Sequence, residues 1–443
     1  MNEKLDVKAA EQERSAMTEQ EKLDTRRLHP VNKTLFRAMA LLTRLLFKKK
    51  YGVTFTYAID RAQYRDKPYV LVSNHASRAD YVFTGLAMWP DAFNYVVGYN
   101  EFFRGHLARL LRALQVVPKK NFTPQPYAVK QMLRIIKEGG RIMIMPEGMS
   151  SISGGSQPCA LGGGRLFKRL GVPVLYTKIA GGYLTNPKYC LDERPGKVEV
   201  TVDLLFSPEQ LEALSADELQ AEMNAKLRHD DYEWNKTARV KYDGHGEMAK
   251  NLHQLLFWCP KCGAELQMQS EGNSLTCRAC GNGATLNEYC DLIPNGPDCV
   301  IPETPSLWFD EQRAHVRELV RSSDYVLTEH IKLGELPKHG FLKKDDTSIP
   351  CGEGTLTLNR EGLRYDGTRN GAHFEFFVPI KRLPTYGMCT DVSRFYTFVD
   401  GEFLEFFPER ESAELWFMAT EELHRQNGGA WQDYPDKLLR SGK

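Results

Sequence analysis

A histidine and an aspartate lie five residues apart directly after a short apolar stretch. Residues 69–73 open as an apolar run with two β-branched valines, which is typical of a buried strand, and His75 and Asp80 follow them. A carboxylate that accepts a hydrogen bond from one ring nitrogen leaves the other nitrogen free to take a proton. The pair therefore has what general-base catalysis requires. A histidine held only for packing would have the same spacing, so both interpretations stay open at this point.

A second short apolar stretch, residues 141–145, also ends in polar residues, among them Glu147, Gly148, Ser150 and Ser151. Parallel strands deliver such residues to the same edge of a sheet, where α/β folds place their chemistry. The sequence has no G-x-S-x-G nucleophile pattern beside these residues. We therefore expect the activated hydroxyl to belong to a substrate.

These two stretches resemble the motifs of the glycerolipid acyltransferase family, which includes the 1-acylglycerol-3-phosphate acyltransferases. The matching residues are Asn74, His75 and Asp80 for the family's N-H-x4-D motif, Pro146, Glu147, Gly148 and Ser151 for part of its P-E-G-T-R-S block, and residues 172–174 for a later V-P-V strand. The three motifs occur in the family's order. The resemblance implies an α/β acyltransferase domain.

The resemblance also implies a reaction. A fatty acyl group would pass from acyl-CoA or acyl-carrier protein to the hydroxyl of a lysophospholipid-type acceptor, with 1-acylglycerol 3-phosphate expected. His75 would act as the general base and Asp80 would orient it. Asn74, Glu147, Gly148 and Ser151 would belong to the substrate-binding residues. The resemblance would thus place the protein in phospholipid biosynthesis.

In this family a basic residue after another strand contacts the acceptor phosphate, and Lys119 and Lys120 occupy that place here. A lysine binds phosphate as a point charge, without the fork geometry of arginine. The alternative is that both lysines are solvated, as surface lysines usually are.

The P-E-G-T-R-S block departs from the family pattern, because Met149 and Ser150 replace its threonine and arginine. This change removes a cation that would help to hold an anionic headgroup. Arg78 and Arg165 are candidates to supply the charge from another direction. Ser150 keeps its place among the candidate substrate-binding residues.

Residues 31–50 have a helical pattern with an apolar side and a basic side. Leu35, Met39, Leu42 and Leu46 share one face, and no acidic residue occurs in the segment. A helix of this kind can lie in a membrane surface, with its cations among anionic headgroups. The alternative is a helix that simply packs on the domain, and the lipid substrate implied above favours the membrane.

Two C-x2-C knuckles, at Cys259 and Cys262 and at Cys277 and Cys280, have the spacing of a zinc ribbon. Four thiolates form a closed site, so we expect a structural zinc ion rather than a catalytic one. A rubredoxin-like iron site and a redox dithiol are the alternatives. The other six cysteines lack such spacing.

The composition limits the cellular compartment and the binding partners that we expect. The formal net charge of the 443 residues is +1, so no overall field attracts nucleic acid, and no nucleic-acid partner is expected. The ten cysteines include a metal-type set and favour a reducing compartment. The sequence lacks a signal-peptide pattern and a run of about 18 apolar residues. We therefore expect a cytoplasmic protein, peripheral to the membrane.

The fold class expected is an α/β acyltransferase domain with a mixed sheet, followed by a zinc ribbon and a β-barrel-plus-helix domain. The last part resembles pleckstrin-homology or GRAM-like domains in pattern. The predicted divisions are a polar N-terminal segment (1–30), the amphipathic helix (31–50), the acyltransferase domain (51–250), the ribbon (251–300), a helical linker (301–323) and the C-terminal domain (324–443). An alternative function is a catalytically weak lipid-binding or scaffold protein that uses the last two domains.

Overall fold

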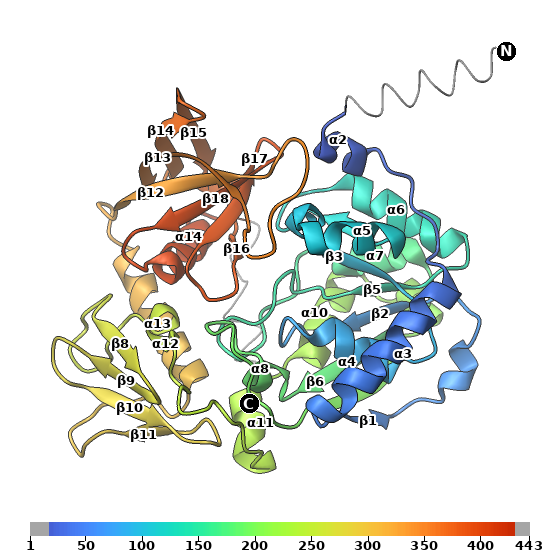
Figure 1. The fold of residues 1–443 in the computed structure, drawn as a ribbon, viewed down its shortest axis with the longest axis horizontal. Coiled ribbons are helices and arrows are strands. Elements are labelled where there is room, and N and C mark those ends of the chain that lie inside the picture. Colours follow the sequence, from blue (N-terminus) through green and yellow to red (C-terminus); the bar gives the residue numbers. More distant parts are fainter. Residues whose placement is uncertain (1–16, 430–443) are drawn as a thin grey trace.

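The computed structural model describes residues 17–429, which form three units (Figure 1). An α/β unit occupies the right side of Figure 1, a small antiparallel sheet lies at the lower left, and a larger curved antiparallel sheet lies at the upper left. The expected fold class is confirmed. Of the predicted polar N-terminal segment, residues 1–16 lie outside the described part, and α2 (Glu19–Asp24) begins at a capping box on Thr18.

The first unit contains a seven-stranded mixed sheet in the order β1-β7-β6-β2-β5-β3-β4. Only the β6–β7 pair is antiparallel. The strands are β1 (Thr54–Tyr57), β2 (Val70–Ser73), β3 (Asn94–Gly98), β4 (Val117–Lys119), β5 (Ile142–Ile144), β6 (Val174–Ala180) and β7 (Glu199–Phe206). All four residues of β2 are buried, because the strand lies at the centre of the sheet with both faces covered.

Helices cover both faces of this sheet. One apolar cluster packs α3 (Lys33–Lys50) and α4 (Asp80–Ala87) on one face. Another packs α6, α7, α9 and α10 on the opposite face. The helices of this second cluster are α6 (Pro126–Lys137), α7 (Gly163–Leu170), α9 (Pro208–Ala213) and α10 (Ala216–Leu227). The other helices of the unit are η1 (Arg61–Tyr64), η2 (Tyr99–Phe103), α5 (Gly105–Ala113), α8 (Gly182–Thr185) and α11 (Asp231–Ala238).

The second unit is a four-stranded antiparallel sheet in the order β11-β10-β9-β8. Its elements are α12 (Leu252–Leu255), β8 (Met268–Glu271), β9 (Ser274–Cys277), β10 (Gly283–Leu286) and β11 (Leu292–Pro294). The helix α13 (Pro305–Leu319) then leads to the third unit. It begins with Thr304 as the N-cap and proline in the first turn, within the predicted helical linker.

The third unit is a seven-stranded antiparallel half-barrel followed by α14 (Ala413–Gln426), with strand order β15-β14-β13-β12-β18-β17-β16. The strands are β12 (Leu327–Glu335), β13 (Ile349–Leu358), β14 (Gly362–Arg369), β15 (Ala372–Pro379), β16 (Gly387–Met388), β17 (Phe395–Val399) and β18 (Glu402–Pro408), with η3 (Ile380–Arg382) between β15 and β16. Inside the curve, packed rings of Phe395, Phe406 and Trp416 join the sheet to α14.

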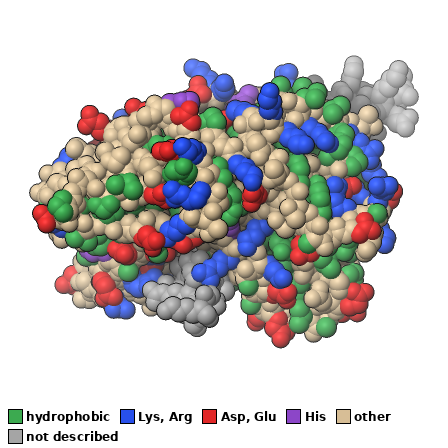
Figure 2. All heavy atoms as spheres, turned by 90° about the horizontal axis from the view of Figure 1, so that it is seen from below, with side chains coloured by type: hydrophobic (Ala, Val, Ile, Leu, Met, Phe, Trp, Pro, Cys, Tyr) green, Lys and Arg blue, Asp and Glu red, His purple; other side chains and the backbone are tan. Residues whose placement is uncertain are grey.

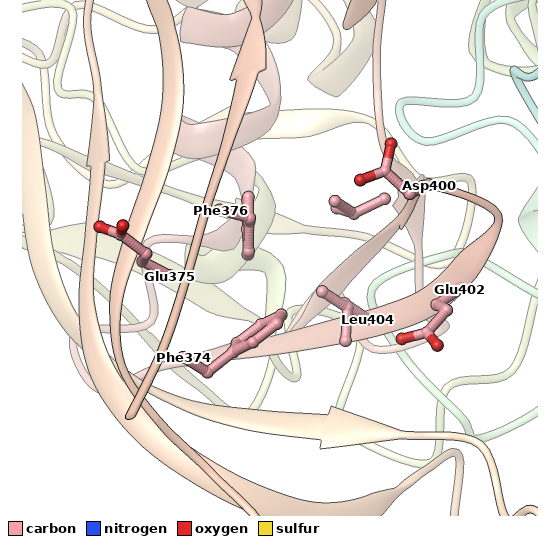
Figure 3. Close-up of a pocket in the computed structure, with 7 residues that line it drawn as sticks. Phe374, Glu375, Phe376, Asp400, Glu402 and Leu404 are labelled. Carbon is pink, nitrogen blue, oxygen red and sulfur yellow. The ribbon is translucent and has the colours of Figure 1, made fainter. Parts of the chain in front are cut away.

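The half-barrel contains a cavity of about 290 Å³ near the β17–β18 turn (Figure 3). Phe374, Phe376 and Leu404 provide apolar walls, and Asp400 and Glu402 contribute carboxylates. A lining of this kind repels anions.

The three units share one continuous hydrophobic cluster. It includes Tyr183 and Tyr189, which follow β6, together with Leu255 of α12 and Phe395 and Trp416 of the half-barrel. The second and third units therefore pack against the segment that follows β6, and are not joined to the first unit by a linker alone.

Candidate active site

The turn after β2 is held in place by Asn74. This side chain is buried; its Nδ2 donates to the carbonyl of Ile179 at 2.9 Å, and its Oδ1 accepts from the Ile179 N–H at 2.7 Å. The amide thus ties the end of β2 to β6 as a substitute for backbone pairing. Asn74, predicted among the substrate-binding residues, has both ends of its amide occupied by the protein.

His75 and Asp80 form the pair that the sequence predicts. His75 Nδ1 lies 2.9 Å from Asp80 Oδ2, and Asp80 is the first residue of α4. Asp80 also accepts from the Ser77 N–H at 2.9 Å and from the Ser77 hydroxyl at 3.0 Å. Three donors and the helix N-terminus therefore hold this carboxyl in one orientation.

The two members of the pair differ in exposure. The Asp80 side chain is fully buried, whereas 20% of the His75 side chain is exposed. Burial raises the pKa of Asp80, and the hydrogen bonds from His75 and Ser77 act in the opposite direction. Within the described residues only Nδ1 of the His75 ring has a hydrogen-bond partner. This arrangement leaves Nε2 free to exchange a proton at an accessible surface.

Glu147 organises the backbone around His75. Its Oε1 accepts from the His75 N–H at 2.9 Å, and its Oε2 accepts from the Gln157 N–H at 3.2 Å. The Ser151 N–H donates to the His75 carbonyl at 2.7 Å, so the turn after β5 is bonded to the turn after β2. Burial raises the pKa of Glu147 to about 8. Sequence reasoning had no basis for this shift, because burial depends on the whole fold.

Gly148 and Ser151 shape the same turn. Gly148 has φ +82°, and a Cβ there would lie 3.1 Å from the Phe122 ring, so glycine is required. Its carbonyl accepts from Asn121 Nδ2 at 2.8 Å. The Ser151 hydroxyl donates to the Gly155 carbonyl at 2.6 Å and accepts from the Gly154 N–H at 2.9 Å.

The ammonium groups of Lys119 and Lys120 both contact carbonyl oxygens of the protein. Lys119 Nζ donates to the carbonyls of Lys120 and Thr123, at 2.7 and 2.9 Å, and burial lowers its pKa to about 8. Lys120 Nζ donates to the carbonyl of Gly401 in the half-barrel at 3.0 Å and lies 4.7 Å from the centre of the Tyr99 ring. Neither lysine is simply solvated.

The two candidate arginines lie apart. Arg78 donates to the carbonyls of Cys190 and Leu191, in the segment that follows α8. Arg165 is exposed on α7, which covers the face of the sheet opposite to α4. The structure thus brings Arg78, but not Arg165, onto the turn that carries His75.

Ser150 has a partner that the sequence did not reveal. Its hydroxyl lies 3.2 Å from Lys188 Nζ, and both residues are buried. Lys188 belongs to none of the motifs and lies 38 residues further along the chain. No local signal in the sequence identifies such a pair, because the contact depends on how the segment after β6 folds back.

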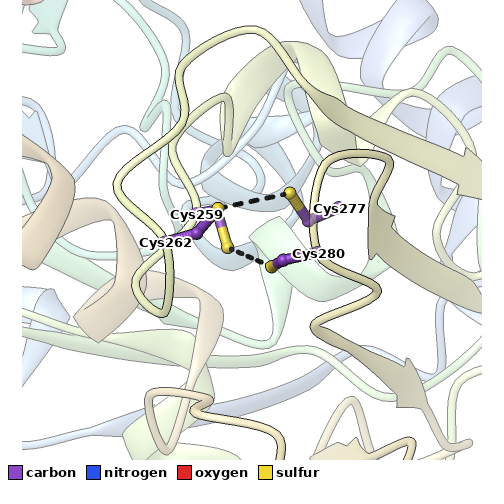
Figure 4. A group of neighbouring side chains, drawn as sticks. All are labelled: Cys259, Cys262, Cys277 and Cys280. Atoms are coloured by element: carbon purple, nitrogen blue, oxygen red, sulfur yellow. Dashed lines mark hydrogen bonds between the residues drawn. The ribbon is translucent and has the colours of Figure 1, made fainter.

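The four knuckle cysteines converge on one point (Figure 4). Their sulfur atoms all lie within 4.8 Å of one another, with 3.7 Å between Cys259 and Cys280 and 3.8 Å between Cys262 and Cys277. Zn–S bonds of about 2.3 Å in a tetrahedron require sulfur atoms about 3.8 Å apart. The cluster therefore fits a tetrahedral metal ion such as zinc. Among the described residues it is the one group of this kind.

None of the helices within residues 17–429 is both long and apolar enough to cross a membrane.

One comparison with known protein families covers the part of the chain that carries these residues. Residues 54–177 match the family model described as "Acyltransferase", whereas no curated protein matches the chain. A similar solved structure is the 1-acyl-sn-glycerophosphate (LPA) acyltransferase PlsC from Thermotoga maritima, at 20% identity and a TM-score of 0.36, covering 42% of this chain and 74% of that chain. The matched residues include His75, Asp80 and Glu147. Residues 54–177 are therefore similar to the acyltransferase family.

Proposed function

We propose that the protein transfers a fatty acyl group from acyl-CoA or acyl-carrier protein to the hydroxyl of a lysophospholipid-type acceptor, with 1-acylglycerol 3-phosphate the expected acceptor. The observation that carries this proposal is the 2.9 Å contact between His75 Nδ1 and Asp80 Oδ2 at the end of β2, inside the matched family domain. The pair leaves one ring nitrogen available beside an accessible surface.

In the proposed reaction, His75 Nε2 takes the proton from the acceptor hydroxyl as its oxygen attacks the thioester carbonyl. The carbon–sulfur bond then breaks, and the imidazolium returns the proton to the departing thiolate. Asp80 stabilises the imidazolium and holds its Nδ1–H. Glu147 and Ser151 act on the backbone of His75 and keep the ring in position.

A transfer assay tests this proposal. Purified full-length protein is incubated with labelled acyl-CoA, or with labelled acyl-carrier protein, and a set of lysophospholipids that includes phosphate-free monoacylglycerol. We expect labelled diacyl product with 1-acylglycerol 3-phosphate. Formation of free fatty acid alone, or no product with any acceptor, would contradict the proposal.

Attachment to a membrane surface with anionic lipids is proposed through α3. One side of this helix packs on the domain through Phe36 and Phe47. The opposite side is exposed, with exposed fractions of 47% for Leu41, 59% for Leu42, 72% for Leu45 and 59% for Leu46. Lys48, Lys49 and Lys50 form its last turn. On the face drawn in Figure 2, acidic and basic side chains are intermingled, so attachment would depend on this helix more than on overall charge.

A double substitution on the exposed side of α3 tests the attachment. Leu42→Gln with Leu46→Gln should weaken binding to phosphatidylglycerol-containing vesicles at least about tenfold, since each buried leucine contributes about 1.5–3 kcal/mol. Vesicle co-sedimentation measures the effect. Leu161→Gln, at a leucine of similar exposure just before α7, is the matched control. Equal binding by the double variant and the wild type would exclude α3 as the attachment site.

The four cysteines are proposed to hold a structural zinc ion. Their sulfur spacing supports a four-coordinate ion with no open position, which has no part in the acyl transfer.

The lipid-binding or scaffold alternative has less support. The half-barrel cavity is lined by Glu375, Asp400 and Glu402, which would repel an anionic headgroup, whereas the His75–Asp80 pair is intact.

A further inference from the structure

Lys188 is a buried cation without a carboxylate partner. Only 6% of its surface is exposed, and its Nζ donates to the Ser150 hydroxyl at 3.2 Å. Within residues 17–429, no carboxylate oxygen lies within the 4.0 Å of an ion pair with Lys188. Lysines are rarely buried without such a partner, because desolvation of the ammonium is costly. The residue therefore calls for a functional explanation.

The acidic groups that act on Lys188 from neighbouring elements already have partners. Glu101 of η2 forms an ion pair with Arg104 at 3.0 Å. Asp391, between β16 and β17, lies 3.6 Å from Arg394. Each carboxylate is shared with an arginine, and neither forms an ion pair with the Lys188 ammonium.

For two further groups facing Lys188, burial disfavours the charged form. Burial raises the pKa of Glu414 on α14 well above its ordinary value. Burial also raises the pKa of the Cys389 thiol, which donates to Glu405. The remaining charged neighbour, Arg78, is itself a cation.

Lys188 and Arg78 lie beside the turn that carries His75. Ser150, which accepts from Lys188, precedes Ser151, and the Ser151 N–H donates to the His75 carbonyl at 2.7 Å. Arg78, three residues after His75, donates to the carbonyls of the same segment that carries Lys188. Both cations are therefore bonded to neutral oxygen atoms next to the turn that holds the base.

We infer that Lys188, together with Arg78, binds a phosphate group of a substrate and supplies the cation lost where Ser150 replaces the arginine of the family block. The inference rests on the proposed function and names the residues that would bind the phosphate of its substrate. A phosphate oxygen would replace the Ser150 hydroxyl as the acceptor for Lys188. Burial lowers the pKa of Lys188 to about 8, and a bound phosphate dianion would hold its proton. The phosphate belongs either to the acceptor headgroup or to the CoA of the donor.

Kinetics of a Lys188→Gln variant test the inference, because glutamine keeps a donor for Ser150 and removes the charge. Loss of a charged hydrogen bond should raise KM for the phosphate-bearing substrate about 10- to 100-fold with little change in kcat. If the acceptor supplies the phosphate, KM rises for 1-acylglycerol 3-phosphate but not for monoacylglycerol. If the donor supplies it, KM rises for acyl-CoA but not for acyl-pantetheine. Lys188→Arg should restore part of the affinity, and Lys178→Gln on β6 is the matched control.

A titration that needs no turnover separates this inference from the proposed function. Calorimetry of the full chain with glycerol 3-phosphate and with CoA should show binding of at least one of them by the wild type, weakened at least tenfold in Lys188→Gln. Equal affinities, or no binding by the wild type, would overturn the inference even if acyl transfer is observed. If no acyl transfer is observed, the proposed function fails and the titration still decides the phosphate site.

Thermal unfolding separates binding from a purely structural role. Because an unpaired buried charge is costly, Lys188→Gln should leave Tm unchanged or raise it. A lower Tm combined with unchanged phosphate affinity would show that Lys188 holds the half-barrel in place, and would contradict the inference.

Discussion

Replacement of Asp80 by asparagine is expected to lower kcat for acyl transfer by about 10²- to 10⁴-fold. Asparagine has nearly the same shape and can still accept from Ser77, but it cannot stabilise the imidazolium of His75 or reliably hold its Nδ1–H. KM for either substrate should change little, since Asp80 is fully buried and reaches the substrate only through His75. Steady-state kinetics at saturating acceptor measure the effect.

The control for this experiment is Asp60→Asn, which changes an exposed N-cap of η1 without touching the site. Circular dichroism and Tm establish that both variants are folded. A folded Asp80→Asn protein with wild-type kcat would show that the 2.9 Å contact is structural and not catalytic.

Replacement of Cys277 by serine is expected to release the metal and unfold the four-stranded sheet. One of four thiolates is lost, and structural zinc contributes apparent free energies of about 10–16 kcal/mol to small domains. Metal analysis should give about one zinc per wild-type chain and well under half of that in the variant. Limited proteolysis should cut within residues 251–300.

The loss of stability should extend beyond the four-stranded sheet. Leu255 and Cys277 share a hydrophobic cluster with Trp416 of the half-barrel, so Tm of the whole chain should fall. Cys299→Ser, at a partly buried cysteine outside the cluster, is the matched control. Full zinc content and an unchanged Tm in Cys277→Ser would contradict the proposed site, and iron in place of zinc would identify a rubredoxin-like centre.

Local patterns in the sequence account for most of the fold. The apolar run that becomes β2 and the paired C-x2-C knuckles each depend on neighbouring residues, and each was predicted close to its observed position. The same is true of the His75–Asp80 contact, because five residues of one turn determine it. Such features can be read from spacing alone.

Contacts between distant segments were not predictable in this way. Lys120 donates to Gly401, which is 281 residues away, and Lys188 meets Ser150 across 38 residues. The sequence offered Lys119 and Lys120 as candidate contacts of the acceptor phosphate, but it did not reveal that the half-barrel lies against Lys120. Sequence reasoning overlooked Lys188, because a single lysine outside any motif has no recognisable spacing.

The most direct test of the account compares wild-type protein with His75→Gln in the labelled acyl-transfer assay, at equal protein and with vesicle binding measured in parallel. The account predicts that the wild type forms labelled diacyl product, and that the variant loses at least about 99% of this turnover while staying folded and vesicle-bound. Turnover by His75→Gln at the wild-type rate would contradict it.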